Sequence, residues 1–459
     1  MPRSSWFYRL LRLSPRDEPE VQGLVLSGGG SRASFHIGAL RYLYERCGIA
    51  PTCVVGTSAG SIVGAMLAQS LLADEQSKAL AELENIWLSM TKPEDMYVEQ
   101  AWFTRLRGQW DDIAGLVTQH VMPESTDEPS ETVVETNGDD TPAELVMRAM
   151  TEDPSQDISL TPGIVWQLAG SIARIGRAGA GLTTAVRGAE RAASAYRPGP
   201  IVKRLLFDSS FDASKVATSG VHLRIAFVDL NSGDLRFMRE DGVIVDREDR
   251  PVGDDRYDIT LGVWSSCALP GIFRPVKLGD SIYVDGGVRE NVPVEMAVSG
   301  LGVTKPYVII AAPPGVEQGD YTNKDAVTVL MRVANLVLDE TIEDEVEWAR
   351  TAGACVIQPR LNVHTPLTVD KTLLRINRDY GWIRAAEEIT GASEQARETN
   401  DAIIAARCLW AGLAKKPKGH TAEIASVRDQ IKRLLAQAEQ RLLPPGSETW
   451  ATALAPNVR

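Results

Sequence analysis

The apolar and polar positions near the N-terminus follow two different periods. Residues 23–26 and 53–55 form short apolar runs typical of buried strands, and a glycine-framed turn follows each run. Beyond the turns, apolar residues recur at helical spacing over 36–45, and residues 61–68 are small and apolar, as in a buried helix. The pattern predicts strand, loop, helix, strand, turn and helix over residues 21–72. Strands that alternate with helices in this way predict a parallel sheet covered on both faces.

The pattern changes in the middle of the chain. Residues 123–157 are acidic and polar, with one basic residue, and cannot supply an apolar core. We expect a long insertion over about residues 99–200, with a mobile acidic segment at 123–142. Strand-like patterns return over residues 200–300.

Toward the C-terminus, strand-like runs give way to helical spacing. Residues 307–312 indicate a further buried strand, and residues 354–359 indicate an edge strand. Residues 370–412 and 420–443 carry the spacing of helices.

These patterns predict one α/β domain with flanking segments. The domain covers residues 21–315, after an N-terminal arm over 1–20 and before a mostly helical extension over 316–459. Ligands of open α/β sheets bind at the carboxyl ends of the strands, and both N-terminal glycine turns fall at such ends. We therefore look for chemistry in these two turns.

Composition narrows the class of protein. The 459-residue chain is 44% hydrophobic, which is ordinary for a globular protein. No apolar run reaches the roughly 18 residues that a transmembrane helix needs, and arginines interrupt the apolar residues of the arm, so we expect no secretory signal. The five cysteines are scattered without metal-binding spacing, which favours reduced thiols in a cytoplasmic protein. A net charge of −13 argues against nucleic acid as a partner.

Residues 162–198 form a basic amphipathic pattern within this acidic chain. On a helical wheel, apolar side chains share one side and four arginines share the other: Arg174, Arg177, Arg187 and Arg191. Four glycines weaken the segment as a continuous helix. The pattern is compatible with a surface helix packed on the domain and with a lid that contacts a membrane. The arm 1–20 is a second candidate for peripheral membrane contact.

Three glycine-containing turns carry the candidate chemistry. In Gly56-Thr57-Ser58-Ala59-Gly60, the serine is expected on a sharp strand-to-helix turn at a helix N-terminus, where developing negative charge is favoured. The triple glycine Gly28-Gly29-Gly30 leaves backbone N–H groups unshielded, so they can point at an oxyanion. The third turn, Asp285-Gly286-Gly287, follows a strand-like run and offers a carboxylate.

A serine nucleophile needs a base within hydrogen-bond reach. None of the five histidines has the sequence context of a triad partner. Asp285 is the better candidate, because partial burial after a strand would raise its pKa.

The three motifs, in this order, resemble the patatin-like phospholipase family, which uses a Ser-Asp dyad. The resemblance covers roughly residues 21–98 and 200–315. It includes Ser265 through Pro275, Asn291-Val292-Pro293, and a strand and turn over 223–233. One departure is Ala33, where many members have glycine after the arginine.

The resemblance implies a three-layer α/β/α fold with a mainly parallel central sheet. It also implies hydrolysis of carboxylic esters of lipids, most of all glycerophospholipids, without a metal or cofactor. Ser58 would be the nucleophile, Asp285 the base, and Gly28, Gly29 and Gly30 the oxyanion hole. The supporting residues would be Arg32, Gly56, Gly60, Gly286 and Gly287. Arg32 would either steady the loop or meet a phosphate.

Three alternatives stay open. A conventional serine esterase would require His364 or His420 as its base. A non-catalytic lipid-binding or scaffold protein would not need the intact Ser58 and Asp285. A regulatory or toxin-like lipase whose insertion needs an activator is compatible with the main reading. Head-group preference and oligomeric state are not determined by the sequence.

Overall fold

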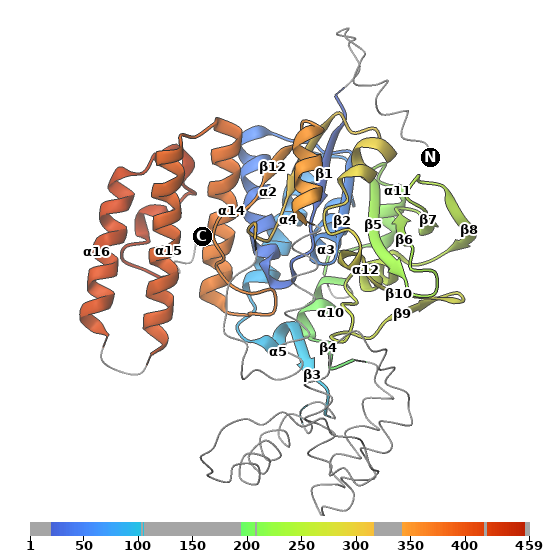
Figure 1. Ribbon diagram of the computed structural model, residues 1–459, viewed down its shortest axis with the longest axis horizontal. Coiled ribbons are helices and arrows are strands. Elements are labelled where there is room, and N and C mark those ends of the chain that lie inside the picture. The colour runs from blue at the N-terminus through green and yellow to red at the C-terminus, as the bar shows by residue number, and fades with distance from the viewer. Residues whose placement is uncertain are drawn as a thin grey trace, which may run out of the picture. The chain divides into compact units, whose positions relative to one another are not determined.

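The computed structural model describes most of the chain outside its central insertion (Figure 1). The described residues are 20–101, 104, 194–206, 209–315, 342–416 and 420–454. The acidic segment 123–142, nearly all of the arm and most of the basic segment 162–198 lie outside them. The expectations for these three segments therefore stay predictions.

A ten-stranded sheet forms the centre of the described structure. Its parallel half has the spatial order β12 (Cys355–Ile357), β11 (Lys305–Ile309), β1 (Gln22–Leu26), β2 (Cys53–Thr57) and β5 (His222–Asp229). The remaining strands are antiparallel: β6 (Leu235–Arg239), β7 (Val243–Val245), β8 (Pro251–Arg256), β9 (Val276–Leu278) and β10 (Ser281–Asp285). The edge position of β12 is as its sequence pattern predicts.

Alternate residues of the parallel strands belong to two separate hydrophobic clusters. In β1, Leu24 and Leu26 join one cluster and Val25 joins the other, because successive side chains point to opposite faces. The first cluster is covered by α2 (Ala33–Cys47), α3 (Ala59–Leu67), α4 (Ala73–Leu88), α12 (Ile259–Ser266) and α14 (Lys371–Thr390). The second is covered by residues 292–303 and the helical residues 342–351. The predicted three-layer α/β fold is confirmed.

The C-terminal part contributes to this same core. Helix α14 packs along α2, and the two cross where glycines face backbone: a Cβ on Gly38 would lie 1.7 Å from the Arg378 carbonyl oxygen, and one on Gly381 would lie 2.1 Å from that of Phe35. Two further helices, α15 (Glu394–Lys415) and α16 (Thr421–Gln437), pack on each other (Figure 1). The segment predicted as an extension thus supplies both a strand of the sheet and a helix of the first layer.

The chain divides into two compact units. The larger comprises Met1–Val98, Pro198–Pro270 and Pro275–Arg459, and the smaller comprises Glu99–Arg197 with Gly271–Arg274. Within the smaller unit, the N–H groups of Ala195 and Tyr196 donate to the carbonyls of Gly271 and Ile272, each at 2.9 Å. The short elements outside the main sheet are α5 (Pro93–Met96), β3 (Tyr97–Glu99), β4 (Tyr196–Pro198), α10 (Pro200–Leu206) and α11 (Ala213–Thr218). None of the helices in the described ranges is long and apolar enough to cross a bilayer.

Candidate active site

Ser58 occupies a strained turn between β2 and α3. Its φ of 52° and ψ of −125° lie in a region that residues with side chains rarely adopt. The flanking glycines permit the turn, because a Cβ on Gly56 would lie 2.6 Å from the Gly60 carbonyl oxygen and one on Gly60 would lie 2.3 Å from that of Leu26. The motif therefore adopts the elbow that its sequence predicts, with Ser58 at the helix N-terminus.

The backbone of Ser58 is fixed by hydrogen bonds on both sides. Its N–H donates to Oγ of Ser266 at 2.8 Å, and its carbonyl accepts from the N–H of Ser61 at 2.9 Å and from Oγ of Ser61 at 2.6 Å. Ser266 is fully buried at the end of α12, whereas Ser58 is partly exposed. Hydrogen bonds thus fix the backbone of the elbow, while Ser58 itself stays partly exposed.

Strand register brings Asp285 to the same place. β2 pairs with β5 up to Thr57, which lies opposite Ala226. β10 pairs with the next residues of β5, so that its last residue, Asp285, lies opposite Phe227. Ser58 directly follows Thr57, and its side chain lies near enough to the Asp285 carboxyl to lower the pKa of that group. Two rigid strands that share one neighbour therefore position this pair.

The carboxyl of Asp285 is buried, with 4% of the residue exposed. Burial raises its pKa to about 6, while the nearby Ser58 side chain and the N–H of Gly287, which donates to Oδ1 at 2.8 Å, act in the opposite direction. A Cβ on Gly286 would lie 2.6 Å from the Ala226 carbonyl oxygen, so this turn can approach β5 only without a side chain. A carboxyl with this pKa is ionised near neutral pH and is a stronger base than an exposed aspartate.

The triple-glycine loop lies against the elbow. A Cβ on Gly28 would be 3.3 Å from Cβ of Ser58. The N–H of Gly28 donates to Oδ1 of Asn291 at 2.9 Å. Gly29 and Gly30 are partly exposed, and within the described residues their N–H groups have no hydrogen-bond partner. Of the three predicted donors, Gly29 and Gly30 are therefore the ones available to an oxyanion.

Asn291 is itself held by a partly buried carboxyl. Glu345 accepts hydrogen bonds from the N–H groups of Asn291 and Val292, at 3.0 and 2.8 Å. Burial raises the pKa of Glu345 to about 8, and the neighbouring carboxyl of Glu290 acts in the same direction. The pKa of Glu290 is raised to about 7 by burial, against the effect of Arg247, which lies 3.2 Å away.

The other end of the glycine loop is fixed by residues 362–368. The N–H of Ser31 donates to the Pro366 carbonyl at 2.9 Å, and Oγ of Ser31 donates to the same oxygen at 2.9 Å. Nε of Arg32 donates to the His364 carbonyl at 2.7 Å, and its Nη2 donates to Oδ1 of Asn362 at 2.8 Å. These contacts are of the kind that steady the loop, which is one of the two roles considered for Arg32.

Helix α14 adds a further contact to the loop. Nδ2 of Asn377 donates to the Arg32 carbonyl at 3.1 Å and to Oγ of Ser34 at 3.0 Å. Gly30, whose φ is 55°, leaves no room for a side chain, because its Cβ would lie 2.5 Å from the Pro366 carbonyl oxygen. The loop is thus held between Asn291 on one side and the C-terminal part of the chain on the other.

The histidines considered as alternative bases lie in other surroundings. His364 is buried with its Nδ1 3.0 Å from the Thr365 carbonyl oxygen, and burial lowers its pKa to about 4. His420 lies at the N-terminus of α16, where its Nδ1 is 2.7 Å from Oε2 of Glu423. Among the described contacts of these two histidines, none involves Ser58.

Sequence reasoning did not assign roles to Asn291, Ser266, Glu345 and Asn377. Asn291 and Ser266 lie in stretches that carried the family resemblance, so a signal for them existed. Glu345 and Asn377 lie in helical stretches whose sequences contain no motif, and only the fold brings them to the site.

Comparison with known families agrees with these motifs. The sequence model of the family described as patatin-like phospholipase matches residues 24–298. The chain belongs to this family. The resemblance drawn from the three motifs is therefore confirmed, and it makes the chain a member of a family of lipid ester hydrolases.

The relatives are similar over only about a quarter of this chain. Lysophospholipase NTE1 of Scheffersomyces stipitis is 36% identical over 116 residues, which is 24% of this chain and 7% of that protein. Lysophospholipase NTE1 of Candida albicans is 35% identical over 111 residues, or 23% of this chain and 8% of that protein. A patatin-like phospholipase domain-containing protein of Caenorhabditis elegans is 32% identical over 121 residues, 26% of this chain and 7% of that protein. The chain thus matches less than a tenth of the length of each.

Among solved structures, the chain is similar to VipD from Legionella pneumophila. The TM-score is 0.32 at 16% sequence identity, with 95% of this chain and 83% of VipD covered. The type III effector protein ExoU gives a TM-score of 0.21 at 15% identity, with 94% of this chain and 72% of ExoU covered.

Proposed function

We propose that this protein is a lipid acyl hydrolase that cleaves carboxylic esters of glycerophospholipids through a Ser58-Asp285 dyad. The observation that carries the proposal is the placement of the partly exposed Ser58 beside the buried carboxyl of Asp285, whose pKa is about 6 and is affected by the Ser58 side chain. Family membership supports lipid esters as the class of substrate.

In the first half of the reaction, Oγ of Ser58 attacks the acyl carbonyl carbon. Asp285 accepts the hydroxyl proton as the new C–O bond forms, and the carbonyl oxygen becomes an oxyanion. The N–H groups of Gly29 and Gly30 donate to this oxyanion. Collapse of the tetrahedral intermediate breaks the ester bond, and the proton held by Asp285 passes to the departing lysolipid alkoxide.

In the second half, the acyl-serine is hydrolysed. Asp285 accepts a proton from a water molecule, which attacks the acyl carbonyl carbon. The oxyanion again lies against the same two N–H groups. The intermediate then releases the fatty acid, and the proton returns from Asp285 to Oγ of Ser58. The cycle consumes one ester and one water molecule and regenerates both residues.

An activity-based probe and a lipid panel test the proposal together. A fluorophosphonate should label the wild-type protein and not Ser58→Ala, and hydrolysis should fall by at least about a thousandfold, as expected when a dyad acts as a unit. Ser232→Ala, which removes an exposed hydroxyl from a turn after β5, is the matched control and should keep both. Free fatty acid and lysolipid from phospholipid, lysophospholipid and triacylglycerol are read by mass spectrometry.

The outcomes separate the remaining alternatives. Labelling that survives Ser58→Ala would reject the nucleophile. A folded wild-type protein that binds phospholipid but neither reacts with the probe nor releases fatty acid would favour the non-catalytic lipid-binding alternative. The substrate that turns over fastest in the panel decides between phospholipase, lysophospholipase and neutral lipase.

Peripheral membrane contact through the basic segment 162–198 and the arm 1–20 remains part of the proposal. Its support is the sequence pattern, since nearly all of these residues lie outside the described part. Arginines near anionic lipid contribute roughly 1 kcal/mol each. Changing Arg174, Arg177, Arg187 and Arg191 together to Gln should weaken vesicle binding and leave hydrolysis of a short soluble ester unchanged. Equal losses of vesicle binding and of soluble-ester hydrolysis, together with a lower melting temperature, would favour a surface helix packed on the domain.

A further inference from the structure

Glu345 joins a helix outside the matched family segment to the stretch of chain that follows Asp285. It lies in the helical residues 342–351, whose buried side chains belong to the second hydrophobic cluster. The same cluster contains Val292 and Val294, so this helix packs on the stretch that leads away from Asp285. Packing on one side of the sheet therefore sets where the carboxyl of Glu345 lies.

Both carboxyl oxygens of Glu345 accept hydrogen bonds from the backbone of this stretch. Oε1 accepts from the N–H of Asn291 at 3.0 Å, and Oε2 accepts from the N–H of Val292 at 2.8 Å. Asn291 and Val292 are buried, with 7% and 1% of each residue exposed. A buried N–H that loses its acceptor carries a free-energy cost, because water cannot take the acceptor's place. The carboxyl thus fixes the backbone at these two residues.

The side chain of Asn291 transmits this restraint to the glycine loop. Its Oδ1 accepts from the N–H of Gly28 at 2.9 Å. A Cβ on Gly28 would lie 2.3 Å from the same oxygen, so the loop is in direct contact with the amide group of Asn291. Gly29 and Gly30, whose N–H groups are the available donors, follow directly in the chain. A movement of Asn291 would therefore move these donors.

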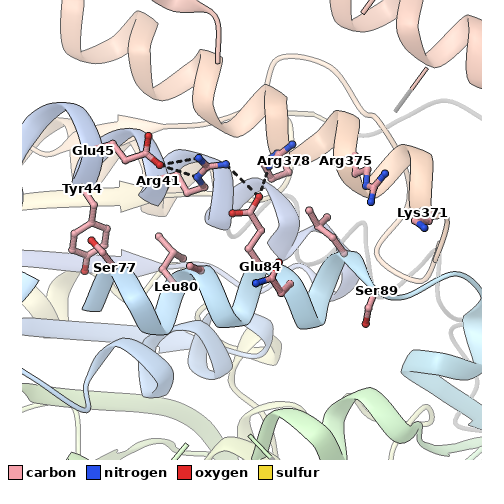
Figure 2. A pocket seen from close by; sticks show the side chains of 13 residues that line it. Arg41, Tyr44, Glu45, Ser77, Leu80, Glu84, Ser89, Lys371, Arg375 and Arg378 are labelled. Atoms are coloured by element: carbon pink, nitrogen blue, oxygen red, sulfur yellow. Dashed lines mark hydrogen bonds and ion pairs between the residues drawn. The ribbon is translucent and has the colours of Figure 1, made fainter. Parts of the chain in front are cut away.

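The contacts of Glu345 differ from those of Glu84, another partly buried carboxyl. Glu84 borders the pocket between α2, α4 and α14, where Arg41 and Arg378 both pair with it (Figure 2). Within the described ranges, no basic side chain lies within ion-pair distance of Glu345, and its hydrogen bonds are to backbone N–H groups. A carboxyl that is desolvated without a cation is costly for folding, and such exceptions are expected at functional sites.

We propose that Glu345 is a positioning residue that holds the oxyanion loop in its reactive position through Asn291. The inference rests on the proposed function, which assigns the N–H groups of Gly29 and Gly30 to the oxyanion. Loss of the carboxyl frees the backbone at Asn291, and the loop donors then no longer point at the developing charge. The donors act mainly in the transition state, so kcat falls while KM changes little.

Hydrogen–deuterium exchange tests the restraint without turnover. In a Ser58→Ala background, exchange of the peptide that covers residues 27–32 is compared among Glu345→Ala, Glu345→Gln and the control Glu240→Ala. Glu240 is also partly buried, and it accepts from a backbone N–H, that of Leu223, at 3.1 Å. We expect exchange about tenfold faster in Glu345→Ala than in the control. Glu345→Gln should show a smaller increase, because its Oε1 still accepts from one N–H.

Kinetics with Ser58 intact test the consequence for catalysis. On a short soluble ester, kcat should fall about tenfold in Glu345→Ala with KM unchanged, and Glu345→Gln should recover part of kcat. An alkyl trifluoromethyl ketone probes the oxyanion directly. Oγ of Ser58 adds to its carbonyl carbon, Asp285 accepts the hydroxyl proton, and the carbonyl oxygen becomes an oxyanion. The inhibition constant should rise by about the factor by which kcat falls, which a general loss of stability would not produce.

The outcomes distinguish failure of this inference from failure of the proposed function. An active wild-type protein whose Glu345→Ala variant keeps its kcat, or equal effects of Glu345→Ala and Glu240→Ala, overturns this inference alone. A wild-type protein without hydrolysis or probe labelling overturns the proposed function, and the exchange of residues 27–32 then decides by itself whether Glu345 holds the loop. Melting temperatures identify a temperature at which all variants are folded. If Glu345→Ala does not fold, Glu345→Gln, which keeps the size of the side chain, is compared with Glu240→Gln.

Discussion

The side chain of Ser58 lies beside the carboxyl of Asp285, because Ser58 directly follows β2, Asp285 ends β10, and both strands pair with β5. The pair is therefore positioned by the sheet and not by a loop, which fixes a reacting geometry more closely. The same placement buries Asp285 and raises its pKa to about 6. The placement of Asp285 at the end of β10 therefore accounts both for its position beside Ser58 and for its raised pKa.

The first prediction is that kcat/KM rises with pH through about 6 and then reaches a plateau, because Asp285 must be ionised to accept a proton. Asp285→Asn should be nearly inactive at every pH. It should be no less stable than wild type above pH 6, because a carboxyl whose pKa is raised on folding lowers stability as pH rises through that pKa. Initial rates on a soluble ester and thermal unfolding measure the two effects.

Histidine variants are the controls for that profile. His364→Ala and His420→Ala should keep the same midpoint and most of the plateau activity. A folded variant of either histidine without activity would show that the base is a histidine and that the conventional esterase mechanism applies.

The second prediction concerns the fit of Gly29 against Ala311. A Cβ on Gly29 would lie 2.6 Å from Cβ of Ala311, so even Gly29→Ala must displace the loop. We expect turnover to fall by about a hundredfold, as for the loss of one oxyanion donor, and Gly29→Val to lose more. Combining Gly29→Ala with Ala311→Gly removes the opposing methyl group and should restore part of kcat. Failure of the double variant to recover any activity, while folded, would mean that the loop does not act through its position.

The fold and the proximity of Ser58 to Asp285 could be predicted from the sequence because each depends on local signals. The apolar run at 23–26, the turn at Ser58 and the strand before Asp285 each carry a short motif with its own strand or turn context. The order of the motifs then indicated the family. The pKa shift of Asp285 followed from the expected burial.

The restraint of the glycine loop could not be predicted, because it arises between distant segments. Ser31 bonds to Pro366, and Arg32 bonds to Asn362, through contacts that depend on where α14 packs. The backbone carbonyl of Pro366 has no sequence signature as an acceptor. The availability of each loop N–H also depends on a tertiary contact, since only the fold shows that Asn291 engages that of Gly28.

The third prediction is that Asn291 acts on turnover by holding the loop. Asn291→Ala removes the acceptor at 2.9 Å and leaves the N–H of Gly28 with only the Asn291 carbonyl oxygen at 3.4 Å, and losing the main partner of a buried donor costs about 1–3 kcal/mol. We expect kcat on a soluble ester to fall about tenfold or more with little change in KM. Asn291→Asp keeps an acceptor oxygen and should recover part of kcat, whereas equal losses in the two variants would indicate that the hydrogen bond is not what matters.

The fourth prediction concerns stability against pH. The pKa values of Glu290 and Glu345 are raised to about 7 and about 8, so the folded state holds protons that the unfolded state has released above about pH 4.5. Stability from this pair is present below that pH and is lost as pH rises through 7 to 8. The groups that face the pair are Arg247 and Glu295. Thermal unfolding of Glu290→Gln should depend less on pH in this window, and an unchanged profile would exclude the pair as the cause.

The last prediction is that Asn377, on a helix beyond the matched family segment, supports turnover. Its Nδ2 is the donor to the Arg32 carbonyl, next to the loop that carries Gly29 and Gly30. Asn377→Ala should therefore loosen the loop and lower kcat about tenfold, the effect of roughly 1.4 kcal/mol on the barrier.

Asn400→Ala is the matched control for this change. Asn400 is also a buried asparagine, and its Nδ2 donates to Oε1 of Glu387 at 2.8 Å, within the C-terminal helices. Both variants lose a buried hydrogen bond and should show lower melting temperatures, but only Asn377→Ala should lose kcat at a temperature where both are folded. Equal kcat in the two variants would mean that the C-terminal part stabilises the fold without holding the oxyanion loop, and a selective loss would make α14 part of the active-site support.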